Sequence, residues 1–517
     1  MKKTCLKSIV FGSAAALAFV TAAAAGGRAG QGVPVIGLER KRAVLAEFVD
    51  FLSIPNVSSD RESIRRNAEH LAGMMRRRGM ETRILETEGG PPVVFGEVKT
   101  PGARRTLLLY AHYDGQPVDP AAWTSDPWRP VLRAGPAAEK APAVRLEDLP
   151  ADGAGEWRLY GRGTSDDKGT ILAALAAVDV LKERRMEPSV NLKFLFEGEE
   201  EAGSGHLEPL LRSQAPLFAA DAMLLCDGPV HQSRRPQVVF GARGVLSLEL
   251  TVFGPDRALH SGHYGNWAPN PAALLAQLLA SLRDKDGRIL VPGFYDDVRP
   301  LAPAEIEAIR AAPPVEDGLR REFGLAWTEG GSARLEERIM LPALNIRGLS
   351  AGNVGRTAQN AVPTEATASI DFRLVPDQMP DKVRDRVEGF IRSLGFELVR
   401  GEPTAEERRL APRFVRLRWG GGYPGYRESM DAPFSRALVQ VLDRALGVRL
   451  VRLPALGGSI PMALFSRILG LPVVLFPIAN HDNNQHGPDE NIRLQNVWDG
   501  VEMYVAILAG LGSLWRE

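Results

Sequence analysis

The sequence is poor in cysteine. Of its 517 residues only two are cysteines, Cys5 and Cys226. Cys5 lies in an N-terminal segment that we expect to be removed, which leaves one thiol in the mature chain. A single thiol can form neither an internal disulfide nor a zinc site built from thiolates. Any metal ion would therefore be bound by histidine, aspartate and glutamate.

The chain also lacks an excess of charge of either sign. Lys+Arg and Asp+Glu both number 63. Without a strong global field, steering toward nucleic acid or anionic lipid is not supported, and we expect no nucleic-acid partner. Hydrophobic residues make up 44% of the chain, which is ordinary for a globular protein. A chain of this length can bury a sizeable core without disulfide or metal staples.

One apolar run stands out at the N-terminus. Lys2, Lys3 and Lys7 precede an apolar run at residues 9–20, which a stretch of small residues at 22–25 follows. This order is typical of a secretory signal peptide, and the run is short for a membrane anchor. We therefore expect residues 1–25 to be cleaved. The protein would be exported, periplasmic or secreted, and would have no membrane contact afterwards.

Helical and strand-like segments alternate along the first part of the chain. Apolar residues with helical spacing and short buried-strand runs follow one another. The helical segments are residues 44–54, 64–78 and 168–181, and the main strands are residues 93–98, 106–111, 191–196 and 222–225. This alternation predicts an α/β fold in which a mixed sheet is flanked by helices.

The pattern changes near Phe240, where strands begin to alternate apolar and polar residues. We predict an α/β domain made of residues 26–239 and 412–517, interrupted by an α+β domain at residues 240–411. Residues 130–156 are rich in alanine, proline, glutamate and glycine. We expect them to form an exposed loop.

Five short segments with histidine or carboxylate side chains each follow an apolar strand-like run. They contain His112 with Asp114, Asp166 with Asp167, the glutamates between 197 and 201, Asp227, and His481 with His486. In open α/β sheets, sites form outside the carboxyl ends of the strands, so these five segments can converge.

Each segment has an ordinary structural interpretation as well. Aspartate is favoured at helix caps and turns, a run of glutamates is usually solvated, and a lone histidine is more often structural than a ligand. Crowded carboxylates behind a buried strand repel one another unless a cation neutralises them. Together, the five segments favour two zinc ions that share a bridging carboxylate.

At this point the sequence resembles a known family, the dizinc exopeptidases. The motifs LLLYAHYDGQP, WTSDPW, LYGRGTSDDKG, FEGEEEAGS, LHSGHYG, DFRLVP, GGSIP and QHGPDEN occur in that family's order. The family includes non-specific dipeptidases and carnosinases, aminoacylases and succinyl-diaminopimelate desuccinylase. The dipeptidase branch is the most similar, and the resemblance covers nearly the whole mature chain.

The resemblance implies a set of metal ligands around a bridging Asp166. His112 and Asp227 would complete one zinc site, and Glu201 and His486 the other. Co²⁺ or Mn²⁺ could substitute for the two zinc ions. Glu200 would be the general base and Asp114 would orient His112. The three consecutive glutamates, 199–201, leave a one-residue shift of these roles open.

The resemblance also implies that the inserted domain is a lid that mediates homodimerisation. His260 would polarise the scissile carbonyl, reaching in from the partner subunit. Arg373 would bind the free carboxylate of the substrate, and Asn360 and Ser459 would make further substrate contacts. For Arg373 an ion pair at a strand edge stays an alternative, and for His260 a turn in a polar loop.

The predicted activity is zinc-dependent hydrolysis of the amide bond of dipeptides or short peptides that have a free C-terminal carboxylate. The nearest alternative is the same chemistry on an N-acyl amino acid, which also presents an amide beside a carboxylate. A non-catalytic binding or scaffold protein would normally have lost a ligand or the base. A dinuclear phosphatase would also use two carboxylate-bridged metal ions, but no motif in this sequence supports a phosphatase.

Overall fold

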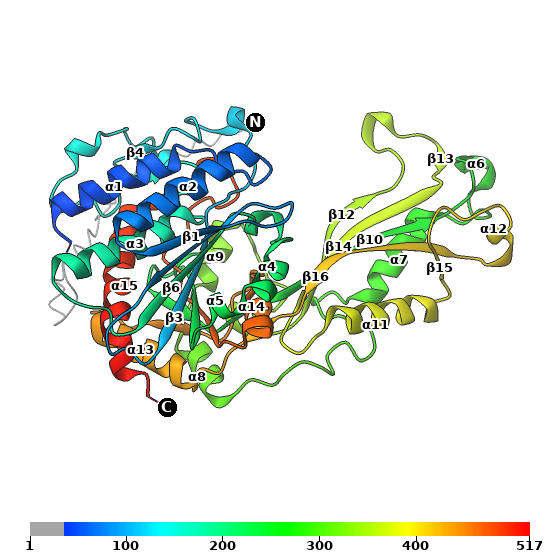
Figure 1. Cartoon of the computed structure of the whole chain (residues 1–517). Helices are drawn as coiled ribbons and strands as arrows, with labels where there is room; N and C mark the ends of the chain where they lie inside the picture. Colours follow the sequence, from blue (N-terminus) through cyan, green and yellow to red (C-terminus); the bar gives the residue numbers. More distant parts are fainter. Residues whose placement is uncertain (1–35, 517) are drawn as a thin grey trace, which may run out of the picture.

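The structure, a computed structural model, describes residues 36–516 and consists of two lobes (Figure 1). The expected signal peptide, residues 1–25, lies outside the described residues. The larger lobe is built on an eight-stranded sheet in which parallel and antiparallel neighbours are mixed. In spatial order its strands are β1 (Glu81–Leu85), β2 (Val93–Val98), β6 (Asn191–Glu197), β3 (Thr106–His112), β7 (Ala222–Leu225), β19 (Val473–Leu475), β8 (Gln237–Val239) and β18 (Val451–Leu453).

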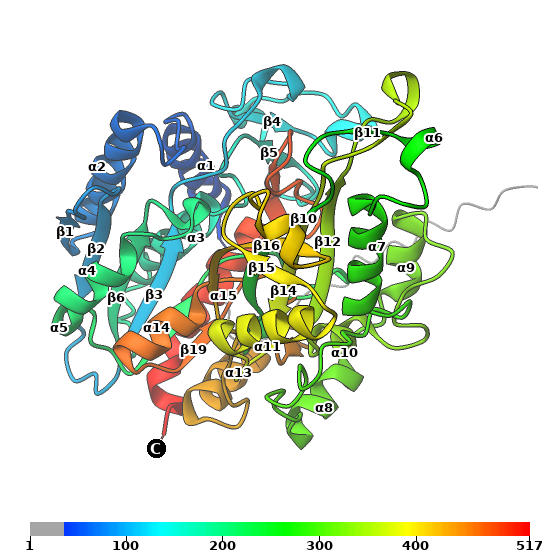
Figure 2. The same cartoon turned by 90° about the vertical axis from the view of Figure 1, so that its right-hand side faces the viewer.

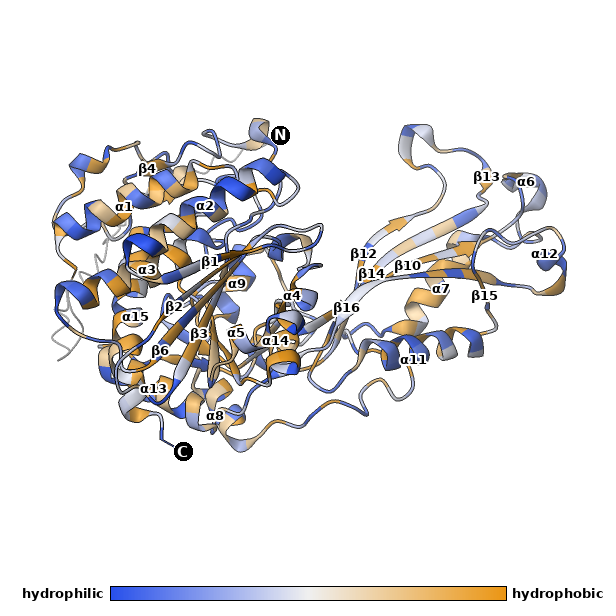
Figure 3. Ribbon diagram, viewed as in Figure 1, coloured by the Kyte–Doolittle hydropathy of each residue, from blue (hydrophilic) through white to orange (hydrophobic). Residues whose placement is uncertain are grey.

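Helices cover both faces of this sheet, because the central strands are apolar on both sides. Leu107 and Leu109 of β3 belong to one core cluster, and Leu108 and Tyr110 to another on the opposite face. Figure 3 shows these strands in the colour of hydrophobic residues. One face carries α1 (Leu38–Leu52), α2 (Arg61–Arg77), α3 (Lys168–Glu183), α13 (Pro433–Ala445) and α15 (Leu494–Leu514), and the other α4 (Leu207–Ser213), α5 (Ala215–Phe218) and α14 (Met462–Leu469). The predicted mixed α/β sheet flanked by helices is confirmed.

The long helix α15 was not predicted. By length and composition alone it could cross a membrane. It instead packs against α3 and α13, and its Val497, Val501 and Leu508 are fully buried. In this fold α15 is a core helix of the larger lobe.

The smaller lobe is a five-stranded sheet with helices on one face. Its strands, in order, are β12 (Ala343–Ser350), β14 (Glu365–Leu374), β10 (Gly244–Phe253), β16 (Phe414–Tyr423) and β15 (Glu397–Val399). Alternate residues such as Leu248 and Ile370 are buried under α7 (Pro271–Leu282) and α11 (Pro380–Ser393). The sheet continues beyond residue 411, where the insert was expected to end. Arginines and glycines in β16 obscure its alternating pattern in the sequence.

Part of the expected insert folds back onto the larger lobe. After α7 the chain forms α8 (Pro303–Ala311), which packs on β18, and then α9 (Glu316–Glu322) and α10 (Leu335–Ile339). It returns to the smaller lobe at β12. A buried ion pair between Arg427 and Glu305, 2.8 Å apart, holds α8 beside the last crossing, at which the chain returns from the smaller to the larger lobe. The division at residues 240–411 therefore does not follow the packing.

A short ladder ties two of the chain crossings together. β9 (Gly241–Ala242) pairs with β17 (Tyr426–Arg427) in antiparallel register. A Cβ atom at Gly241 would overlap the carbonyl oxygen of Tyr426, and one at Gly244 would overlap that of Tyr423. The close approach of the two backbones at this crossing therefore depends on glycine.

Residues 130–156 are folded rather than a simple exposed loop. They contain β4 (Val131–Arg133) and two short 3-10 turns. β4 pairs with β5 (Arg158–Tyr160), which pairs in turn with β20 (Asn491–Arg493). Leu132 and Leu149 are buried in the main core. Most of this stretch is exposed or half-buried, as expected for an excursion, but these few apolar residues anchor it to the core.

Candidate metal centre

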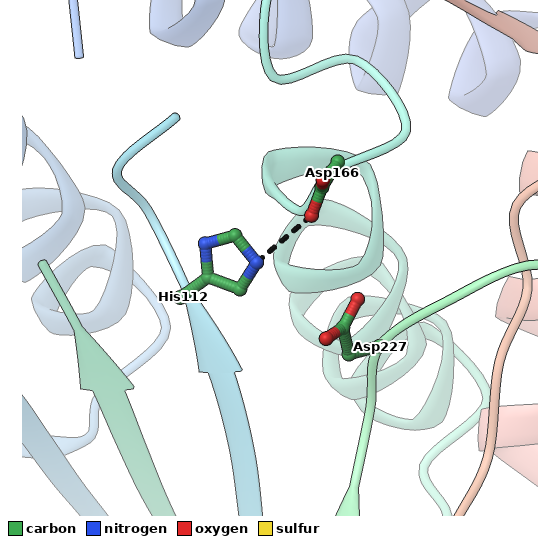
Figure 4. Close-up of side chains that lie close together, drawn as sticks. All are labelled: His112, Asp166 and Asp227. Carbon is green, nitrogen blue, oxygen red and sulfur yellow. Dashed lines mark hydrogen bonds and ion pairs between the residues drawn. The ribbon is translucent and has the colours of Figure 1, made fainter. Parts of the chain in front are cut away.

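Two groups of potential metal ligands meet at one edge of the larger sheet. His112, Asp166 and Asp227 form the first group (Figure 4), and Asp166, Glu201 and His486 form the second. Within each group the ligand atoms lie within 4.8 Å of one another. Asp166 belongs to both groups. The structure thus brings together the five side chains that the sequence proposed as ligands.

The ligands converge because neighbouring strands end at the same edge. β6, β3, β7 and β19 are adjacent and parallel, so their carboxyl ends point the same way. His112 is the last residue of β3, and Asp227 follows β7. Glu201 lies in a 3-10 turn after β6, and His486 lies in the loop after β19. Asp166 precedes α3, and its peptide bond to Asp167 is cis.

Short contacts join the ligand atoms through Asp166. One of its carboxylate oxygens lies 2.9 Å from Nε2 of His112, and the other lies 3.0 Å from Nε2 of His486. The same nitrogen of His486 is 3.3 Å from a carboxylate oxygen of Glu201. On the far side of His112, Nδ1 is 3.3 Å from Asp114, which suits an orienting role.

The residues fit a cationic occupant. His112, Asp166 and Asp227 are buried, and within residues 36–516 one carboxylate oxygen of Asp227 has no hydrogen-bond partner. Burial, followed by the nearby charge of Asp166, raises the pKa of Asp227 to about 7. Burial also raises the pKa of Glu200 well above its ordinary value. A bound cation would relieve this crowding, and imidazole and carboxylate are ligands that zinc accepts.

The three consecutive glutamates, 199–201, can be told apart by the groups that their side chains contact. The carboxylate of Asp114 accepts hydrogen bonds from the backbone N–H groups of Glu200 and Glu201, both at 3.1 Å. Glu201 then points into the ligand group, whereas Glu199 lies 2.8 Å from Nδ1 of His206. This geometry agrees with Glu201 as the ligand and leaves Glu200 as the half-buried carboxylate beside it.

Comparison with known proteins identifies the family. The profile of peptidase family M20/M25/M40 matches residues 108–510. The chain belongs to this family. As a member it is a metallopeptidase-type hydrolase with a metal cofactor, and the resemblance noted from the motifs is confirmed.

The M20 relatives match most of this chain. The Cys-Gly metallodipeptidase dug1 of Schizosaccharomyces pombe is 27% identical, covering 90% of this chain and 96% of its own. The human Beta-Ala-His dipeptidase is 28% identical, covering 82% of this chain and 78% of its own. Among solved structures, an M20 family metallo-carboxypeptidase from Sulfolobus solfataricus is 30% identical with a TM-score of 0.73, covering 91% of this chain and 99% of that one.

A residue that sequence reasoning missed in this M20 peptidase is Glu490. It is fully buried and accepts hydrogen bonds from the glycine-rich loop before α3. The donors are Nη1 of Arg162, the backbone N–H groups of Gly163, Ser165 and Asp166, and the hydroxyl of Ser165, at 2.7–3.1 Å. Its only signal in the sequence is a carboxylate four residues after His486. Gln485 and Gln116 were also missed, and they donate to Asp166 and Glu201.

Arg373, in β14 of the smaller lobe, contacts Ser459, which lies between β18 and α14 of the larger lobe. Nη1 of Arg373 donates to the hydroxyl of Ser459 at 2.9 Å, and its Nε donates to Asp371 at 2.7 Å. Tyr423, in the same row of the sheet, has a pKa that burial and then the charge of Glu200 raise. Tyr423 is thus close enough to Glu200 for the charge of that carboxylate to act on it. The ion pair with Asp371 is the alternative that the sequence left open, and within residues 36–516 Nη2 of Arg373 has no hydrogen-bond partner.

His260 and Asn360 lie elsewhere in this chain. His260 ends β11 (Leu259–His260), which pairs with β13 (Ala361–Val362), and the following N–H of Ser261 donates to the carbonyl of Asn360 at 2.9 Å. Both side chains are exposed. Figure 1 places α6 (Ser261–Tyr264) and β13 at the end of the smaller lobe that is remote from β3. Within one chain the structure does not bring them to the metal ligands.

Proposed function

We propose that the protein hydrolyses the amide bond of dipeptides or short peptides that have a free C-terminal carboxylate. The observation that carries this proposal is the pair of ligand groups that share Asp166, with Glu200 beside them and Arg373 held by Ser459 where the two lobes meet. The names of the relatives, a Cys-Gly metallodipeptidase and a Beta-Ala-His dipeptidase, support a dipeptide substrate. They give no support to an N-acyl amino acid.

The proposed metal content is two zinc ions per subunit, bound as the two groups suggest, with Co²⁺ or Mn²⁺ as substitutes. When bound, zinc would supply a Lewis acid and lower the pKa of water. Glu200 would accept the proton of the attacking water on a carboxylate oxygen and pass it to the leaving amine. Its burial beside other carboxylates suits this role, because a raised pKa brings the group closer to neutral pH.

Arg373 would hold the free carboxylate of the substrate. Ser459 and Asp371 fix the guanidinium, so that little rotamer freedom is lost when the substrate binds. The test is a substrate panel with the zinc-loaded protein. Cys-Gly and β-Ala-His should be hydrolysed, while the same dipeptides with a C-terminal amide should react about ten- to a hundredfold more slowly. Equal rates for free and amidated dipeptides would overturn the assignment.

The proposal includes a homodimer in which His260 acts on the site of the partner subunit. Exposed apolar side chains of the smaller lobe support it, since Trp267, seven residues after His260, is 80% exposed and Val354 is 83% exposed. Mixing two inactive variants tests it. In a dimer of one His260→Ala subunit and one Glu200→Gln subunit, one site has both an intact base and an intact partner histidine. Recovery of activity on mixing is expected, and none should return if His260 acts within its own chain.

Export is proposed from the N-terminal sequence pattern alone. The basic start, the apolar run and the small residues before 26 support cleavage after Ala25. Sequencing the N-terminus of the protein recovered from the cell exterior and from the cytoplasm is the direct test. An intact N-terminus in a cytoplasmic protein would refute it.

A further inference from the structure

A large cavity lies where the two lobes meet, beside Arg373 but away from the metal ligands. Its volume is about 850 Å³, within the range of ligand sites, and such sites often lie at domain interfaces. The walls come from α9, from the segment before and after α10, and from the first residues of β12. Figure 2 shows α9 and α10 on the β12 side of the molecule. Nothing in the proposed reaction so far uses this cavity.

The cavity continues the row of the sheet that contains Arg373. In the strand register Tyr423, Val245, Arg373 and Ala343 are direct neighbours on successive strands. Side chains of one row project from the same face of a sheet. The Tyr423 end of the row lies near Glu200, and Ala343 at the other end lines the cavity. A substrate that extends from the metal centre to Arg373 therefore points onward to this cavity.

The cavity carries an excess of positive charge. Six arginines and three carboxylates line it. The three carboxylates each pair with one arginine: Glu329 with Arg283, Asp317 with Arg320, and Glu316 with Arg334. Within residues 36–516, Arg243, Arg310 and Arg338 have no carboxylate partner. The cavity thus suits an anionic group.

Arg243 stands at the border between the cavity and Arg373. Its Nε donates to the carbonyl of Gly457 at 2.9 Å, two residues before Ser459. In the part of the chain that the structure describes, its Nη atoms have no hydrogen-bond partner and can bind a ligand in the cavity. Burial, and then the positive charge of Arg373, lower the pKa of Arg243 to about 10. Two neighbouring guanidinium groups repel each other, and a second carboxylate on the substrate would relieve that repulsion.

We propose that this cavity is the subsite for the C-terminal residue of the substrate, and that Arg243 binds an acidic side chain there. The inference rests on the proposed function. With the α-carboxylate on Arg373, the side chain of the same residue enters the cavity beside it. Dipeptides that end in glutamate or aspartate are then preferred substrates, and Arg243 is the residue that determines this specificity.

The test compares Ala-Glu, Ala-Gln and Ala-Leu on the full zinc-loaded protein. Glutamine has the shape of glutamate without its charge, so Ala-Gln is the matched control. Ala-Glu should exceed Ala-Gln about tenfold or more in kcat/KM. Arg243→Met should remove this preference by lowering the value for Ala-Glu about ten- to a hundredfold, and should change the other two less than about threefold.

Two further variants complete the experiment. Arg347→Met removes an exposed arginine of β12 that lies outside the cavity, and should keep the wild-type ratio of Ala-Glu to Ala-Gln. Arg243→Lys should retain part of the preference. The ratio does not depend on the folded fraction of a variant. Equal rates for Ala-Glu and Ala-Gln, or a uniform loss in Arg243→Met, would overturn this inference alone. Failure to hydrolyse any of the three would overturn the proposed function.

Discussion

Replacing Glu490 by glutamine should destabilise the protein and weaken metal binding, although the residue touches no metal ligand side chain. One of its carboxylate oxygens accepts from Arg162 and Gly163, and the other from Ser165 and Asp166. Glutamine can replace only one oxygen by an NH₂ group. Whichever side receives it, at least two N–H donors then face another donor.

The expected loss follows from these contacts. Two hydrogen bonds to a charged acceptor contribute about 3–6 kcal/mol, and breaking one partner of a buried ion pair costs about 3–5 kcal/mol. We therefore expect Glu490→Gln to lower the free energy of unfolding by about 3–5 kcal/mol. The affinity for metal should fall about ten- to a hundredfold, because the loop that positions Asp166 loses its support.

Urea unfolding of the metal-free protein measures the first effect, and competition with a chromophoric chelator measures the second. Asp489→Asn is the matched control. Asp489 accepts from the backbone and hydroxyl of Thr124 at the surface, so its loss should cost less than about 1 kcal/mol. If Glu490→Gln unfolds like the wild type, or binds metal equally well, Glu490 does not support the loop in the way described.

Further predictions concern catalysis, metal and pH. Glu200→Gln should lower kcat about 10²- to 10⁴-fold with unchanged metal content, and retained turnover would exclude it as the base. Asp227→Asn should reduce the metal bound per chain from two ions to one by elemental analysis, and two retained ions would exclude it as a ligand. Arg373→Met should lower kcat/KM for free dipeptides about ten- to a hundredfold but leave amidated dipeptides unchanged. Burial raises the pKa of Asp482, but hydrogen bonds from Arg158 outweigh it and lower the pKa below its ordinary value. The ionised Asp482 therefore stabilises the fold above pH about 4, and this contribution is lost on acidification. The difference in urea stability between wild type and Asp482→Asn should therefore shrink below pH 4, and a constant difference would contradict this.

The sequence was informative about the larger sheet for a physical reason. Strands such as β3 and β7 are buried on both faces, so their apolar runs are continuous and easily recognised. The ligands follow these runs directly, which is why His112 and Asp227 could be proposed as neighbours. Asp166 and His486 depended more on the motifs, because each lies in a loop.

What the sequence did not reveal depends on contacts between distant segments. The hydrogen bond between Arg162 and Glu490 spans 328 residues, and no local pattern records such a pair. The return of α8 to the larger lobe is equally non-local, since its apolar residues Ala308 and Ile309 would suit either lobe. The cavity beside Arg243 combines segments from both lobes, and only their packing shows that it exists.

The repeated passage of the chain between the lobes has a mechanical consequence. The β9–β17 ladder and the ion pair between Arg427 and Glu305 fix the crossings relative to each other. The smaller lobe is therefore attached to the larger one at several points rather than by a single flexible linker. Its outer end, which carries His260, is then held at a nearly constant reach from Asp166. During turnover the smaller lobe should therefore move as a rigid body through small rotations. Glu305→Ala removes the ion pair and should make the distance between His260 and Asp166 more variable without changing any metal ligand.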